Sequence, residues 1–109
     1  MKQPIRITVD PVCSHTYVEY QDSDKEDGWL QLLREPDGSI VEIGRDDPRQ
    51  DEPLGVLVFV DKGDDIVAIE IITIDEPELV AIARDYATDN GLAFPSDIRA
   101  AASAGDPAA

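Results

Sequence analysis

The first twenty residues alternate between hydrophobic and polar positions in a way that predicts a β-hairpin. Residues 5–9 read Ile-Arg-Ile-Thr-Val, so every second side chain is apolar, as in a strand with one buried face. Residues 15–20 are a second short run of strand-forming residues. Asp10-Pro11 lies between the two runs and is a turn signal. We therefore expect a first hairpin over residues 5–20.

A second pair of apolar runs predicts a second hairpin. Residues 29–33 and 40–43 flank Glu35-Pro36-Asp37-Gly38, in which proline presets the backbone for a turn and glycine tolerates the positive φ at its exit. The segments on either side, 21–28 and 46–53, are acidic and nearly free of apolar residues. Such composition is typical of solvated loops.

The clearest hairpin joins residues 54–60 to residues 66–72 across the polar segment 61–65. Both runs are apolar at almost every position, whereas a strand with one wet face would alternate. We therefore expect both faces of the sheet to be covered at these strands. A C-terminal helix would cover one face. The other face requires either the hairpin 5–20 folded over it or a second copy of the chain, as in a homodimer.

A helix is predicted from about Glu76 to Asn90. Asp75 is expected to cap it, with Glu78 three residues later as in a capping box, and Pro77 is tolerated in the first turn. Gly91 is expected to end it. The apolar stripe at helical spacing consists of Leu79, Val80, Ile82, Ala83, Tyr86 and Ala87.

Together these elements predict an α+β fold: a mostly antiparallel sheet of five or six strands, built from three hairpins, with one main C-terminal helix packed on it. The chain has 109 residues, which suffices for one core. We expect a single domain over residues 1–103 and a flexible tail over residues 104–109. A weaker helix is expected over residues 96–102.

The charge of the chain is strongly acidic. Its 24 acidic residues against nine Lys and Arg leave a formal net charge of −15. A field of this sign repels phosphates, so direct binding to nucleic acid or to an anionic membrane is not expected. A single cysteine allows no internal disulfide, and no run approaches the ~20 apolar residues of a membrane span, so a cytoplasmic protein is expected.

Three short motifs resemble a family of bacterial and phage proteins known as domain of unknown function 2283. They are an opening strand that ends in Asp10-Pro11, the pair Tyr17-Val18, and the closing strand over residues 66–72, which reads Ile-Val-Ala-Ile-Glu-Ile-Ile. The resemblance implies a compact β-rich domain without an established enzymatic activity. Members are often encoded beside small toxin-like proteins, so the resemblance also implies an antitoxin-like, partner-binding role.

The sequence favours a non-enzymatic protein-binding module that engages a basic partner through an acidic surface. Complementary charge would speed the encounter and fix its orientation, while an apolar patch would supply affinity. The alternative is a phage-type nucleic-acid mimic that inhibits a DNA- or RNA-binding protein, with carboxylates in rows spaced like phosphates. The candidate partner-binding residues are Asp22, Asp24, Glu26, Asp27, Trp29, Asp46, Asp47, Asp51 and Glu52.

Cys13 and His15 are a candidate pair for catalytic chemistry. They lie two positions apart, so on a strand they would share a face, and a thiolate beside an imidazole is the beginning of a cysteine nucleophile. No glycine-framed nucleophile turn accompanies them, and a zinc site would need more ligands of this type. We therefore expect no catalytic residues.

Two acidic features remain. The segment from Asp22 departs from a calcium-binding loop because Asp27 stands at the sixth position, where glycine is required, and Leu33 at the twelfth, where glutamate is required. No metal and no cofactor are expected.

Glu70 is a charged residue within an apolar strand. It is either an outward residue that blunts a sheet edge or a partly buried carboxylate with a raised pKa at a contact surface.

Overall fold

The computed structural model describes residues 1–44, 46–49 and 55–105. In chain order its elements are β1 (Arg6–Val9), β2 (Thr16–Glu19), a 3₁₀ turn η1 (Ser23–Lys25), β3 (Gly28–Arg34), β4 (Ile40–Ile43), β5 (Val56–Val60), β6 (Ile66–Ile71), α1 (Pro77–Asp89) and α2 (Ile98–Gly105). The predicted hairpins are present as β1–β2, β3–β4 and β5–β6. Leu54, expected to open the third hairpin, lies outside the described residues.

The six strands form one antiparallel sheet in the order β1-β2-β6-β5-β3-β4. The predicted α+β class and the antiparallel sheet are therefore confirmed. The hairpin over residues 5–20 was one of the two alternatives expected to cover the second face of the sheet. It does not fold over that face. Instead β2 pairs with β6 from Thr16↔Ile71 to Glu19↔Ala68, so the hairpin extends the sheet sideways.

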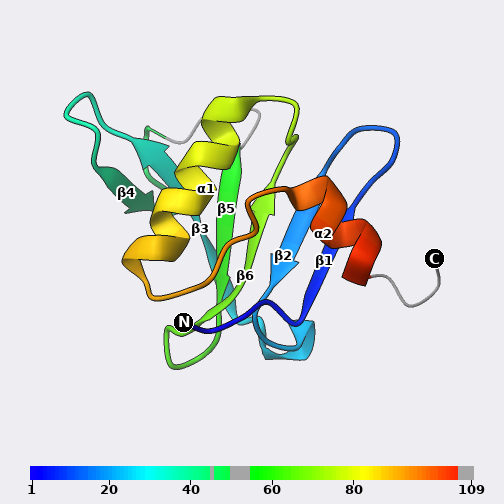
Figure 1. Ribbon diagram of the computed structural model, residues 1–109. Helices are drawn as coiled ribbons and strands as arrows, with labels where there is room; N and C mark the ends of the chain where they lie inside the picture. The colour runs from blue at the N-terminus through cyan, green and yellow to red at the C-terminus, as the bar shows by residue number, and fades with distance from the viewer. Residues whose placement is uncertain (45, 50–54, 106–109) are drawn as a thin grey trace.

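Both helices lie on the same face of this sheet (Figure 1). Helix α1 contacts β3, β5 and β6, and α2 contacts β1. The predicted stripe of α1 is confirmed, since its most apolar positions face the sheet and are buried or half-buried. The core between the two layers consists of Val18, Tyr20, Leu32, Val56, Val58, Ile69, Ile71, Ile82, Ala83, Tyr86, Ala87, Leu92 and Ile98.

Helix α1 begins differently from the sequence prediction. Its N-cap is Glu76, whose side chain makes no capping hydrogen bond, and Pro77 occupies the first turn. The predicted Asp75 cap is wrong because the Asp75 carboxylate instead accepts a hydrogen bond from Arg99 on α2, with Nη2 and Oδ1 2.9 Å apart. Proline at the first helical position needs no amide partner, which makes a side-chain cap less necessary. The predicted stop is confirmed: Gly91 has a φ of +71°, a conformation that favours glycine.

Helix α2 starts at Ile98 and continues to Gly105, so it reaches two residues into the segment expected as a tail. Asp97 stabilises its first turn, because the Asp97 carboxylate accepts the backbone N–H of Ala100 at 3.1 Å. Ile98 is buried against the sheet. The second helix is therefore part of the layer that covers β1.

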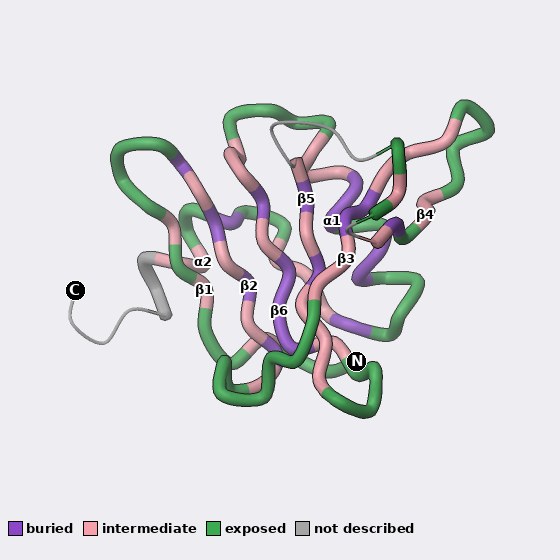
Figure 2. Tube along the Cα trace, turned by 180° about the vertical axis from the view of Figure 1, so that it is seen from behind, coloured by how far each residue is buried: buried purple, intermediate pink, exposed green. Residues whose placement is uncertain are grey.

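The opposite face of the sheet carries no helix in the described chain. Seen from behind, β1, β2, β6 and β5 are unobstructed (Figure 2). On this face Tyr17, Leu57 and Phe59 are half-buried, whereas their neighbours Val18 and Val58 are fully buried under the helices. The register places Ala68, Gln31 and Ile43 on the same face as Leu57 and Phe59, and these three are buried. In the described chain, helices therefore cover one face only.

Candidate protein-binding face

Strand register identifies the residues of the uncovered face. Side chains that lie opposite one another in an antiparallel sheet point to the same side. One row runs Thr8, Tyr17, Glu70 and Leu57 across β1, β2, β6 and β5, and the next runs Arg6, Glu19, Ala68, Phe59 and Trp29. We call these nine residues, together with His15 and the adjoining Glu26, the open face.

The centre of the open face is an aromatic pair. The rings of Tyr17 and Phe59 are stacked, with their centroids 5.7 Å apart and their planes inclined by 22°. The two residues belong to β2 and β5, so their rings meet across β6, which lies between these strands. The residue of β6 between Glu19 and Phe59 is Ala68, which is fully buried. Its small side chain leaves room for the rings above the central strand.

Three carboxylates surround this pair. Glu19 and Glu70 come from the sheet, and their side chains keep only 15% and 18% of their accessible surface. Glu26 comes from the loop that leads into β3. Burial raises the pKa of Tyr17 to about 12, and the negative charges of Glu70, Glu26 and Glu19 add to that rise. All three carboxylates therefore act on the same aromatic ring.

The carboxylates also act on one another. Partial burial raises the pKa of Glu26 above its ordinary value, and repulsion from Glu19 and Glu70 raises it further. Within the described residues Glu26 forms no ion pair. The open face thus concentrates negative charge that the chain compensates only in part.

The partial compensation comes from Arg6 and His15. Arg6 Nε lies 3.2 Å from Glu19 Oε2, but the Arg6 side chain is 67% exposed. His15 Nε2 lies 2.5 Å from Glu70 Oε1, and this pair is ionic only when the imidazole is protonated.

The interpretation of Glu70 as a residue at a sheet edge is wrong, because β6 is flanked by β2 and β5.

The acidic loop before β3 contributes Glu26 to the open face, and Trp29 follows it as the second residue of β3. Its earlier acids serve the turn itself: the Asp22 carboxylate accepts the backbone N–H of Asp24 at 3.1 Å at the start of η1. Asp22, Asp24 and Asp27 are exposed, and Trp29 is half-buried beside Phe59. Of the five candidate residues predicted in this segment, Glu26 and Trp29 therefore belong to the open face.

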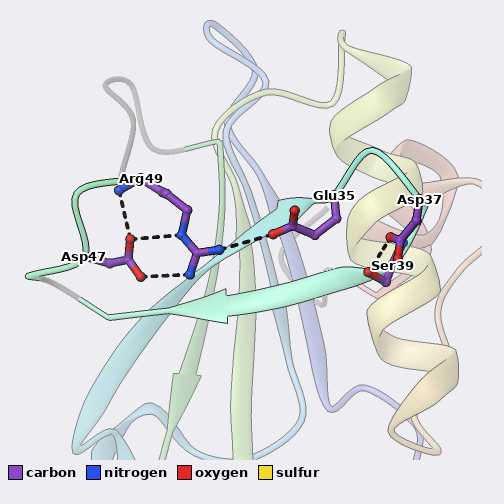
Figure 3. A network of polar contacts seen from close by, with 5 residues as sticks. All are labelled: Glu35, Asp37, Ser39, Asp47 and Arg49. Atoms are coloured by element: carbon purple, nitrogen blue, oxygen red, sulfur yellow. Dashed lines mark hydrogen bonds and ion pairs between the residues drawn. The ribbon is translucent and has the colours of Figure 1, made fainter.

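The second acidic segment has a basic partner of its own. Arg49 binds Asp47 through two nitrogens and reaches Glu35 Oε1 with a third, at 3.2 Å (Figure 3). Hydrogen bonds from Arg49 hold the pKa of Asp47 below its usual value. The segment follows β4, whose last residue Ile43 pairs with Gln31, and Glu35 directly follows β3. Asp46 is exposed in this second loop, and Asp51 and Glu52 lie outside the described residues.

Asp37 and Ser39, also drawn in Figure 3, form the β3–β4 turn. The Asp37 carboxylate accepts the backbone N–H and the hydroxyl of Ser39 at 2.9 and 2.7 Å. These hydrogen bonds lower the pKa of Asp37. Its negative charge therefore stabilises the predicted turn, and the acids at this end of β3 are occupied by local contacts.

Cys13 and His15 have different hydrogen-bond partners in the structure. Cys13 is an exposed free thiol in the β1–β2 turn, where its backbone N–H is bound by the Asp10 carboxylate. His15 instead contacts Glu70 and lies with its ring 6.1 Å from that of Tyr17. No group of three potential metal ligands occurs among the residues the structure describes.

A cleft of about 320 Å³ lies between the segment before β1 and the α1–α2 linker. Its lining includes Pro4, Ile5, Phe94 and Pro95, and Arg6 is its one titratable lining residue. Such a lining offers no pair of acid and base groups. The open face therefore remains the stronger candidate for function.

Comparison of the chain with family models, curated proteins and solved structures gives no match. The resemblance to domain of unknown function 2283 thus stays a prediction from the sequence. Among the described residues no helix has the length and apolar character that crossing a membrane requires.

Proposed function

We propose that this chain is a non-enzymatic protein-binding module whose open face engages a basic partner protein. One observation carries the proposal: a helix-free sheet face has a stacked Tyr17–Phe59 pair at its centre and the carboxylates of Glu19, Glu26 and Glu70 around it. We include the cytoplasmic location expected from the sequence in this proposal.

The composition of the open face favours a protein as the partner. Aromatic side chains at the centre of a contact surface supply a large buried area at little conformational cost. Charged groups at the rim orient the partner and accelerate its approach. The half-buried Tyr17, Phe59 and Trp29 provide the first feature, and the three glutamates provide the second.

The charge favours a basic partner over a second copy of the chain. A symmetric dimer through this face would bring the three glutamates of both copies into one interface. Like charges placed opposite one another across an interface are unfavourable, and each chain already carries −15. A small basic toxin-like protein would meet the requirement, so the antitoxin-like role is part of the proposal.

The nucleic-acid mimic receives less support from the geometry. In the described part of the second acidic segment Arg49 neutralises Asp47, and Asp51 and Glu52 lie outside the described residues. In the first segment Asp22 accepts a hydrogen bond within its own turn. A nucleic-acid mimic would need a row of free carboxylates, and these local contacts do not favour one. We therefore propose the open face, and not the combined middle loops, as the binding surface.

Photo-cross-linking tests the proposal. A photoreactive phenylalanine analogue is placed at Thr8, an exposed position in the same row as Tyr17, and for comparison at Thr88, an exposed position on α1. Irradiation in extract of the native host, followed by mass spectrometry, should attach a basic protein at Thr8 and not at Thr88. A cross-link between two copies of the chain at Thr8 would instead indicate the homodimer.

A matched pair of charge reversals makes the result specific. Glu26→Lys and Glu78→Lys change the net charge equally, but Glu78 lies in the first turn of α1, on the helix layer. We expect Glu26→Lys to abolish the cross-link from Thr8 and Glu78→Lys to leave it. Equal effects of both variants would show that only the total charge matters, which contradicts the proposal.

A further inference from the structure

Resting on that proposed function, we infer that the open face recognises an arginine side chain of the partner, packed on the solvent-accessible part of the Tyr17–Phe59 pair and hydrogen-bonded to the glutamates around it. The inference names the chemical group that the partner must present. It concerns one side chain, and so it can be tested without knowledge of the whole partner.

The aromatic pair supplies the first half of the argument. A cation above an aromatic ring is attracted to the negative face of its π system. The guanidinium group is planar and more weakly hydrated than an ammonium group, so it packs on aromatic rings more readily than lysine does. Tyr17 and Phe59 are both partly accessible from the helix-free side, where β1, β2, β6 and β5 have no other layer over them in the described chain.

The carboxylates supply the second half. Glu26 lacks an ion pair among the described residues, and it lies close enough to Glu19 and Glu70 for their charges to repel its own. Arg6 binds Glu19 through Nε with a largely exposed side chain, and Glu70 contacts His15 Nε2 through one of its two carboxylate oxygens. An arginine has five N–H donors in a fixed planar arrangement, so it can bind carboxylates while its plane contacts a ring. Lysine offers a compact charge without that geometry.

The experiment compares two peptides of equal charge. Isotope-labelled protein is titrated at low ionic strength with a blocked glycine peptide that carries two arginines, and with the same peptide carrying two lysines. Aromatic and amide chemical shifts report both the location and the affinity of binding. We expect shifts centred on Tyr17, Phe59 and Glu26, and about two- to fivefold tighter binding of the arginine peptide.

Variants separate the two contributions. Phe59→Leu removes one ring and should bring the arginine preference close to one, whereas Tyr17→Phe keeps both rings and should retain it. Glu26→Gln should weaken both peptides, and Glu78→Gln on α1 should weaken neither. Thermal melting of each variant checks that it is folded before the affinities are compared.

The results distinguish this inference from the proposed function. Equal affinity for both peptides, lost in Glu26→Gln, would overturn the arginine preference and leave a basic partner in place. A preference that survives Phe59→Leu would overturn the role of the aromatic pair. Failure of both peptides to shift the open face would overturn the arginine inference, and the cross-link from Thr8 would decide the proposed function by itself.

Discussion

The two faces of the sheet are built from neighbouring residues of the same strands, yet they have different properties. On β5, Val58 is fully buried while Phe59 is partly accessible, and on β6, Ile69 is fully buried while the Glu70 side chain keeps 18% of its surface. The covered face excludes water and holds the fold together. The open face carries rings and carboxylates that a sealed core would not tolerate without full pairing. A shift of one residue along a strand therefore separates the side chains that hold the fold together from those that we propose for recognition.

Truncating a side chain should lower the free energy of unfolding more on the covered face than on the open face, and this is the largest difference that we expect between them. Ile69→Ala removes a fully buried side chain from beneath the helices and should lower the free energy of unfolding by about 2–5 kcal/mol. Phe59→Ala acts on the open face and should lower it by about 1–2 kcal/mol, because less apolar surface returns to water. Urea unfolding measures both values. Equal losses would show that the open face is as essential to the core as the covered one.

Local signals explain why the hairpins and the main helix could be predicted from the sequence. The Asp37-Gly38 turn and the stripe from Leu79 to Ala87 are each determined within a few residues. The pairing of β2 with β6 joins residues about fifty positions apart, and no short motif specifies it. The sequence therefore indicated the hairpins but not their order, and it left open whether the first hairpin covers a face.

The sequence predicted only part of the candidate site, because only part of it is formed by residues that are close together in the chain. Glu26 and Trp29 were found because they belong to a continuous acidic segment. Tyr17, Phe59 and Glu70 come together only after β2, β6 and β5 are paired, so no spacing in the sequence announces them. Glu70 was the one signal, because a charged residue in an apolar strand requires an explanation.

Tyr17 in β2 and Tyr20, which directly follows β2, provide a matched test of the two faces. Tyr20 is buried on the covered side, where its hydroxyl donates to the backbone carbonyl of Ala93 at 2.8 Å. The Tyr17 hydroxyl, on the open face, makes no hydrogen bond with the described residues. Tyr20→Phe should lower the free energy of unfolding by about 1 kcal/mol, whereas Tyr17→Phe should change it little. A larger loss in Tyr17→Phe, measured by urea unfolding, would contradict the division of the two faces.

The smallest expected effect is an increase in stability, and it comes from loss of the Glu26 charge. Its carboxyl pKa is raised in the folded state above 4.5, by partial burial and by Glu19 and Glu70. A carboxylate with a raised pKa opposes folding when it is ionised, and this opposition disappears as the pH falls through the raised pKa. The ionised Glu26 should therefore reduce stability at neutral pH, which agrees with the proposal that its charge serves a partner and not the fold.

Replacement of Glu26 by glutamine removes that charge and tests whether its loss stabilises the fold. Since the Glu26 side chain is only slightly buried and solvent screens its charge, Glu26→Gln should raise the melting temperature at pH 7 by only about 1–2 °C. The increase should vanish near pH 4, where the parent carboxyl becomes protonated, and it should shrink as salt shortens the range of the repulsion. Glu78→Gln on α1 is the control and should lack this pH dependence. A lower melting temperature for Glu26→Gln at pH 7 would mean that the glutamate is already compensated, and the charge available to a basic partner would then be smaller than the structure implies.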